Sequence, residues 1–168
     1  VALGWYHYRC HRNYARALEA FHIAQRDLPN NSEVLEGIAF IRRRQGRLEE
    51  ARRDLKHAFE LSPLSADLAI NIAETNLLLR RFPEAERWYN DSIYLAPDQF
   101  VAHCWKARLY WLWQGDTDMA RATLEEMPGK QTPKSIFTWF KQELLEREYQ
   151  PALDRLTSTP NESLANQE

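Results

Sequence analysis

The sequence of 168 residues contains only two cysteines and no long apolar run. Cys10 and Cys104 lie far apart in the chain, so no disulfide framework is evident, and we expect a reducing, cytoplasmic compartment. The longest apolar runs, such as LAINIA, fall far below the ~20 residues that span a bilayer. The net charge is only −2, so no overall field favours nucleic acid or an acidic membrane. We expect neither as a partner.

Motifs of catalysis are also missing from the sequence. It contains no nucleotide-binding loop, no nucleophile elbow and no paired catalytic motif. His7, Cys10 and His11 share one helical turn in HYRCH, a spacing compatible with metal binding. A stable metal site needs three or four protein ligands, and no second cluster is evident. We therefore predict no enzyme, no metal site and no cofactor in this chain.

What the sequence does contain is a repeat. Pro29, Pro63 and Pro97 are spaced by a constant 34 residues. Residues of one size recur at fixed distances from these prolines, as expected when each period is one structural unit. Small residues stand twelve and five positions before each proline and ten after it, and a large apolar residue stands eight before it. The small set is Ala17, Ala51, Ala85, Ala24, Ala58, Ser92, Ala39, Ala73 and Ala107, and the large set is Phe21, Leu55 and Tyr89.

The columns predict two helices in each unit. Apolar residues three or four apart mark one helix face, and small side chains allow two helices to cross closely. Left-handed turns within pairs are expected at Gly46, Gly115 and Asn13. The prolines end each second helix, because proline cannot continue a helix interior. The side chains expected to cap the following helices are those of Asn30, Ser32, Ser65 and Asp98.

This pattern of period, small and large residues and closing proline closely resembles the tetratricopeptide repeat. The resemblance implies an all-α fold, a right-handed α-solenoid of stacked antiparallel helix pairs over residues 1–157. We place the units at 1–30, 31–64, 65–98 and 99–128, followed by a divergent terminal pair at 132–157 that has Phe140 in place of alanine. Residues 158–168 are polar and predicted to be a disordered tail. In the first unit Trp5 stands where a small residue is expected, unless Gly4 takes that place.

The resemblance also implies a function, since the family usually binds peptides on the concave side, which the first helix of each pair lines. A mixture of arginines and aromatic residues there suits a protein or peptide segment with acidic and apolar side chains. The predicted contact residues are Glu36, Phe40, Arg43, Arg44, Asn71, Glu74, Trp105, Arg108, Trp111 and Lys141, with Ile70, Leu78, Cys104, Phe137 and Leu144 beside them.

Asn71 occupies a place where many groove-binding members of this family hydrogen-bond the ligand backbone. The family's clamp for a terminal carboxylate needs several lysine, asparagine and arginine residues in neighbouring units. Here Glu36, Phe40 and Asp67 stand in those places, so we do not expect this clamp.

Other functions remain open from the sequence. Val1 falls inside a helical pattern, so we interpret the chain as a piece of a longer protein. Stretches such as RRQGRLEEA resemble arrays attached to bacterial multidomain signalling proteins, which makes a docking arm for an enzyme one alternative. Homotypic assembly through an uncovered first pair is another. RNA binding could draw on Arg42, Arg43, Arg44, Arg47, Arg52 and Arg53, but these arginines fit better as partners of Glu49, Glu50 and Asp54.

Six tryptophans are more than a core of this size normally needs. Trp111 and Trp113 are two residues apart on a helix, so they point to different sides. We expect that one of them is exposed or covers the last helix pair.

Overall fold

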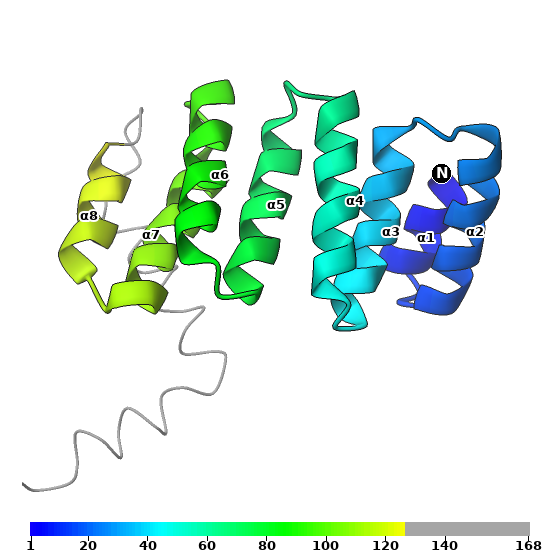
Figure 1. Cartoon of the computed structure of the whole chain (residues 1–168), viewed down its shortest axis with the longest axis horizontal. Coiled ribbons are helices and arrows are strands. Elements are labelled where there is room, and N and C mark those ends of the chain that lie inside the picture. The colour runs from blue at the N-terminus through cyan, green and yellow to red at the C-terminus, as the bar shows by residue number, and fades with distance from the viewer. Residues whose placement is uncertain (127–168) are drawn as a thin grey trace, which may run out of the picture. The chain divides into compact units, whose positions relative to one another are not determined.

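The computed structural model describes residues 1–126, and every regular element in that part of the chain is a helix (Figure 1). Four first helices alternate with four second helices. The first helices are α1 (Ala2–Arg9), α3 (Ser32–Arg44), α5 (Ala66–Leu78) and α7 (Phe100–Gln114). The second helices are α2 (Tyr14–Asp27), α4 (Leu48–Leu61), α6 (Phe82–Leu95) and α8 (Thr117–Glu125). The predicted fold, an all-α solenoid of helix pairs, is confirmed. The expected terminal pair and tail lie outside the described residues.

Each turn within a pair contains one residue in the left-handed conformation. Gly46 has φ +77° and Gly115 has φ +66°, as predicted, and a glycine adopts this conformation without a Cβ penalty. In the first and third turns, arginines take this place, with φ +49° at Arg12 and +56° at Arg80. The prediction for Asn13 is therefore wrong. Its φ is −90°, and its side chain caps α2 by accepting from the Arg16 amide.

The capping residues differ by one position from most of those predicted. Ser65 accepts from the Leu68 amide at 3.2 Å, as expected. The cap of α3 is Asn31, which accepts from the Val34 amide at 3.0 Å, and Asn30 precedes it while Ser32 is already helical. Gln99, not Asp98, precedes α7, and its side chain makes no cap bond. Several oxygen-bearing side chains cluster at each corner, so composition alone does not select the capping residue.

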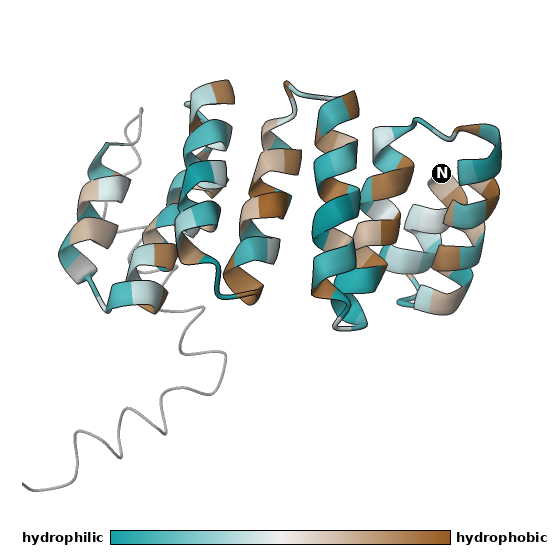
Figure 2. Cartoon of the chain, in the orientation of Figure 1, coloured by the Kyte–Doolittle hydropathy of each residue, from teal (hydrophilic) through white to brown (hydrophobic). Residues whose placement is uncertain are grey.

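Alanines fill the helix crossings. The alanines of the columns ten after and twelve before each proline are all buried, and Ala58 is buried as well. Each hydrophobic cluster joins one helix pair to the first helix of the next: one cluster contains Ala39, Leu55 and Ile72, from α3, α4 and α5. In Figure 2, much of α5 has hydrophobic colouring while α4 is mostly hydrophilic. The first helix α5 is therefore covered on more sides than the second helix α4.

Phe21 shows how little room these crossings leave. A Cβ added at Gly4 would lie 2.6 Å from its ring, and one added at Gly37 would lie 2.3 Å from it. Gly4 is buried and thus takes the small-residue place of the first unit, whereas Trp5 packs edge-on against Phe21 at 5.2 Å between ring centroids. The one-residue shift considered from the sequence is correct.

Neither Trp111 nor Trp113 of α7 is exposed, because both are half-buried. The alternative that one of them covers the last helix pair stays a prediction, since that pair lies outside the described residues. The Trp113 ring stacks on Phe82 of α6 with 5.7 Å between centroids. Since α7 packs against both α6 and α8, side chains on two of its sides are at least partly buried.

Gly37→Ala tests the close contact with Phe21. In the interior of a helix this change normally stabilises by about 1 kcal/mol through helix propensity. Here the added methyl group meets a buried ring, and overpacking costs about 1–3 kcal/mol. We expect a net loss of stability in urea unfolding followed by circular dichroism.

The double variant Phe21→Leu/Gly37→Ala serves as the control. Leucine leaves more room than phenylalanine, so alanine at position 37 should be better tolerated in this background. Equal effects of Gly37→Ala in both backgrounds would contradict the steric explanation.

Candidate functional site

Seven of the ten predicted contact residues share one face of the first helices. We call this the first-helix face and define it by Glu36, Phe40 and Arg43 of α3, Asn71 and Glu74 of α5, and Trp105 and Arg108 of α7, together with Trp5 and Tyr8 of α1. Arg44 is exposed at the end of α3, and its Nε donates to Tyr8 Oη at 3.4 Å. Trp111 is half-buried on α7, and Lys141 lies outside the described residues.

Polar contacts join neighbouring first helices across this face. Asn71 Nδ2 donates to Glu36 Oε1 at 2.9 Å, and Arg43 Nη1 binds Glu74 Oε2 at 3.1 Å, so two contacts connect α3 with α5. Between α5 and α7, Gln99 Nε2 donates to Asp67 Oδ1 at 2.6 Å. Each contact joins consecutive units. The side chains predicted to meet a ligand therefore also align one helix pair with the next.

Aromatic rings concentrate at the α1–α3 end of the face. Trp5 meets Tyr8 and Phe40 edge-on at 5.8 and 5.7 Å between centroids. Its Nε1 donates to Glu33 Oε1 at 2.7 Å. The Arg43 guanidinium lies 4.8 Å from the Phe40 centroid, a cation–π distance.

Arg108 repeats this arrangement on α7. Its guanidinium lies 4.8 Å from the Trp105 centroid. The pair of Arg43 with Phe40 and the pair of Arg108 with Trp105 thus stand at the two sides of α5.

Acidic side chains gather near the starts of α3 and α5. Glu33 and Asp67 occupy equivalent places 34 residues apart, and Glu36 follows one turn after Glu33. Burial, reinforced by Asp67 and Glu33, raises the pKa of Glu36, while Arg9 and Arg43 oppose the shift. Trp5, within this face, and Glu33, which accepts from Trp5 beside it, were not predicted, although the spacing of Glu33 and Asp67 is visible in the sequence.

Two neighbouring predictions are wrong. Ile70 and Cys104 were expected on the groove face, but both are buried, and Ile70 belongs to the cluster around Tyr89. A first helix such as α5 packs against the second helix of its own pair and against that of the preceding pair. Its apolar face is therefore wider than the contact within one pair requires. Leu78, expected beside them, is 55% exposed.

Comparison with known proteins decides the family. The model of the family described as tetratricopeptide repeat matches residues 2–55 and 37–100. The chain belongs to the tetratricopeptide repeat family. A comparison with curated proteins gives no match.

Solved structures with the same fold include other tetratricopeptide repeat proteins. TTC0263 of Thermus thermophilus is 21% identical with a TM-score of 0.70, and the alignment covers 88% of this chain and 80% of that one. MamA is 21% identical, with a TM-score of 0.61 and coverage of 71% and 69%. The first repeat domain of Spaghetti (RPAP3), bound to the HSP90 peptide SRMEEVD, is 17% identical, with a TM-score of 0.60 and coverage of 65% and 86%. At these identities the likeness concerns the fold.

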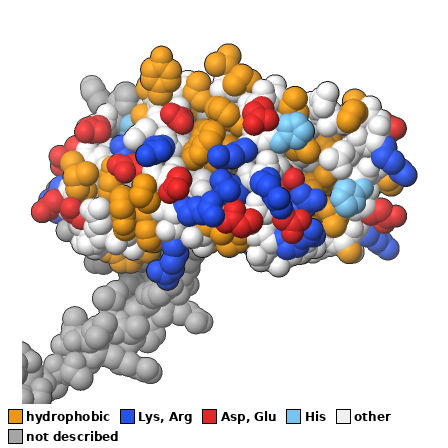
Figure 3. Space-filling view, in the orientation of Figure 1, with side chains coloured by type: hydrophobic (Ala, Val, Ile, Leu, Met, Phe, Trp, Pro, Cys, Tyr) orange, Lys and Arg blue, Asp and Glu red, His pale blue; other side chains and the backbone are white. Residues whose placement is uncertain are grey.

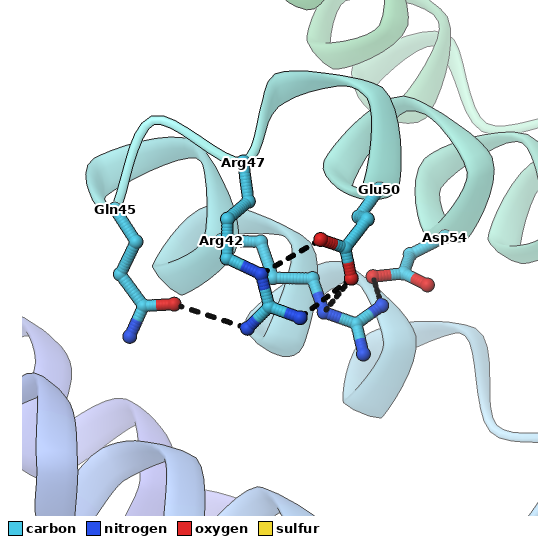
Figure 4. A network of polar contacts seen from close by, with 5 residues as sticks. All are labelled: Arg42, Gln45, Arg47, Glu50 and Asp54. Carbon is cyan, nitrogen blue, oxygen red and sulfur yellow. Dashed lines mark hydrogen bonds and ion pairs between the residues drawn. The ribbon is translucent and has the colours of Figure 1, made fainter.

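The arginine-rich turn of the second repeat is internally paired (Figure 4). Glu50 accepts from Arg47 and lies 4.0 Å from Arg42 Nε, and Arg42 also binds Asp54. The hydrogen bond from Arg47 lowers the pKa of Glu50. These contacts include two of the three carboxylates predicted as partners of the arginines.

Glu49 completes the predicted set. It binds Arg52 at 3.1 Å and Arg81 at 2.7 Å, which links α4 to the turn before α6. Figure 3 accordingly shows basic side chains with acidic ones among them on the face that it presents. The arginines that suggested RNA binding thus serve largely to neutralise nearby carboxylates, and the absence of nucleic acid among the partners stays a prediction.

His7 and His11 of the first repeat form an aromatic cluster with Tyr6. The Tyr6 ring centroid lies 5.6 Å from that of His7 and 4.7 Å from that of His11. Within residues 1–126, no group of three or more His, Cys, Asp or Glu side chains is placed to hold a metal ion. In the same part of the chain, no helix is both long and apolar enough to cross a membrane.

Glu36→Gln should stabilise the protein at neutral pH. A raised pKa means that the folded state holds the proton more tightly than the unfolded state, so the ionised carboxylate opposes folding. This penalty is present above the folded pKa and disappears as the pH falls below the ordinary value of 4.5. Glutamine keeps the oxygen that accepts from Asn71 but carries no charge. We expect a higher melting temperature at pH 7, with the gain lost below pH ~4.5.

Glu60→Gln, at an exposed position of α4, is the matched control and should change little. A lower melting temperature for Glu36→Gln at pH 7, or a gain independent of pH, would contradict the burial of an ionised Glu36.

Proposed function

We propose that this chain is a protein-interaction scaffold that binds a protein segment along its first-helix face. The arrangement of charge on that face carries the proposal. Glu33, Glu36 and Asp67 stand at the starts of the first helices, whereas Arg43 and Arg108 stand in their later turns. The helices α3, α5 and α7 run in the same direction (Figure 1). The face therefore has an acidic row at the helix starts and, in the later turns, a basic row of Arg43 and Arg108, with Glu74 of α5 between them.

Part of this charge separation serves the helices themselves. Acidic groups near helix starts and basic groups near helix ends complement the helix dipole. The aromatic rings beneath the arginines do not follow from the dipole. The guanidinium groups of Arg43 and Arg108 lie over the rings of Phe40 and Trp105, which suits recognition of a carboxylate next to an apolar anchor. A segment with acidic and apolar side chains fits best.

The mode of binding differs from a clamp for a terminal carboxylate. Glu36, Phe40 and Asp67 occupy places where such a clamp needs amides and cations. Asn71 donates one hydrogen bond to Glu36, so its second amide hydrogen and its carbonyl oxygen are what it can offer to a ligand. We therefore propose recognition of an internal segment rather than of a chain end.

Self-assembly is a second candidate, supported by one observation. Leu3 and Tyr6 of α1 and Ile23 of α2 are large apolar side chains that are about half exposed. Light scattering as a function of concentration tests this candidate: a monomer at high concentration excludes it. A role as the docking arm of an enzyme stays a prediction.

Photo-crosslinking tests the main proposal. A photoreactive amino acid in place of Leu78, exposed on a first helix, should capture a protein partner in an extract of the source cells. The same amino acid in place of Tyr94, which is 87% exposed on α6, should capture none. Adding Arg108→Glu should abolish capture at position 78 without loss of helicity, because the basic row is interrupted.

Arg87→Glu is the matched charge control, since Arg87 is exposed on the second helix α6. It should leave capture intact. Equal capture from both positions, or equal loss with Arg87→Glu and Arg108→Glu, would place the binding surface elsewhere.

A further inference from the structure

The hydroxyl of Tyr89 is buried without a hydrogen-bond partner. Tyr89 is 0% exposed in the cluster formed by α5, α6 and α7, and its Oη contacts no donor or acceptor. Leucine and phenylalanine fill the same column in the other units, so packing requires only an apolar residue there. A buried hydroxyl without a partner opposes folding, which makes its presence at this position a feature to explain.

Three charged side chains of the first-helix face influence the pKa of this hydroxyl. They are Glu74 of α5, Arg108 of α7 and Arg43 of α3. Burial is the main cause that raises the pKa of Tyr89, and the negative charge of Glu74 raises it further. The hydroxyl therefore stays protonated at physiological pH and remains a hydrogen-bond donor. No acceptor lies within hydrogen-bond distance of this hydroxyl.

The positive charges near this hydroxyl outnumber the negative ones. Arg43 binds Glu74 at 3.1 Å, but within residues 1–126 Arg108 forms no ion pair. Its guanidinium lies over the Trp105 ring, with 4.8 Å between the guanidinium carbon and the ring centroid. Of the two arginines, only Arg43 is therefore paired with a carboxylate.

We propose that Arg43, Glu74, Tyr89 and Arg108 form a subsite for one acidic side chain of the bound segment. The ligand carboxylate binds between the two guanidinium groups. Glu74 then leaves Arg43 and accepts the hydrogen bond from the Tyr89 hydroxyl. In the occupied state two carboxylates balance two arginines, and the buried hydroxyl has a partner.

This inference rests on the proposed function, because it names the chemistry that the first-helix face selects. It deepens that function by assigning one residue of the ligand. It also gives Glu74 a distinct role, since its charge competes with the ligand for Arg43. Removal of the Glu74 charge should therefore strengthen binding, whereas removal of the Arg108 charge should weaken it.

The test starts with a random library of twelve-residue peptides displayed on phage and selected on the full chain. Selected peptides should share an acidic residue next to an apolar one. One such peptide, labelled with fluorescein, and its counterpart with Gln in place of Glu or Asp are then measured by fluorescence polarisation. We expect the acidic peptide to bind about tenfold more tightly, as for a hydrogen bond to a charged group.

The variants give effects of opposite sign. Arg108→Gln should weaken the acidic peptide about tenfold and leave the glutamine peptide unchanged. Glu74→Gln should strengthen the acidic peptide about three- to fivefold, the range of an exposed ion pair. Arg87→Gln and Glu60→Gln, at exposed positions of second helices, are the matched controls and should change neither.

Tyr89→Phe separates a ligand-binding role from a structural one. The hydroxyl has no partner in the free protein, so its removal should leave the melting temperature unchanged or higher. The acidic peptide should nevertheless bind about fivefold more weakly, because Glu74 loses its new donor. A lower melting temperature with unchanged binding would overturn the proposal.

The proposal and the broader function fail in different ways. Selected peptides that bind with equal affinity to wild type, Arg108→Gln and Glu74→Gln overturn the subsite but leave the scaffold function standing. A library that yields no binding peptide counts against both.

Discussion

Close helix crossings are the constraint on which the rest of this structure depends. Two helices approach closely only where the side chains between them are no larger than a methyl group, and here alanine or glycine occupies these places. The contact of Phe21 with Gly4 and Gly37 leaves no room for a Cβ. Because each cluster also includes the following first helix, the same small residues fix the stacking of pairs.

The repeat period predicted most of the fold, because spacing reports packing directly. Helix pairs, their turns at Gly46 and Gly115 and the alanine crossings all followed from columns of residue size. Details that depend on one side chain among several equivalents did not follow. Asn31 caps α3 although Asn30 and Ser32 flank it, and Arg12 adopts the left-handed conformation expected of Asn13. Local composition is the same for these alternatives, and only the backbone path selects among them.

The candidate site was predictable as a surface but not as a set of contacts. Helical periodicity placed Arg43, Asn71 and Glu74 on one face, and they lie there. It could not show that these side chains bind one another across units, because such pairs join residues about 31 to 35 positions apart. The buried positions of Ile70 and Cys104 were missed because a first helix has neighbours on more than one side. The unpaired Tyr89 hydroxyl is visible only once the packing is known.

The order of contacts along the chain has a consequence for how the protein gains its structure. Helices α1 to α8 pack chiefly on their neighbours in sequence, so no distant segments must meet before the core begins to form. Chains with such local contacts have short loops to close and fold rapidly. Each helix pair can pack onto the preceding pair while the ribosome is still adding residues. The last folded pair then provides the apolar surface on which the next pair folds.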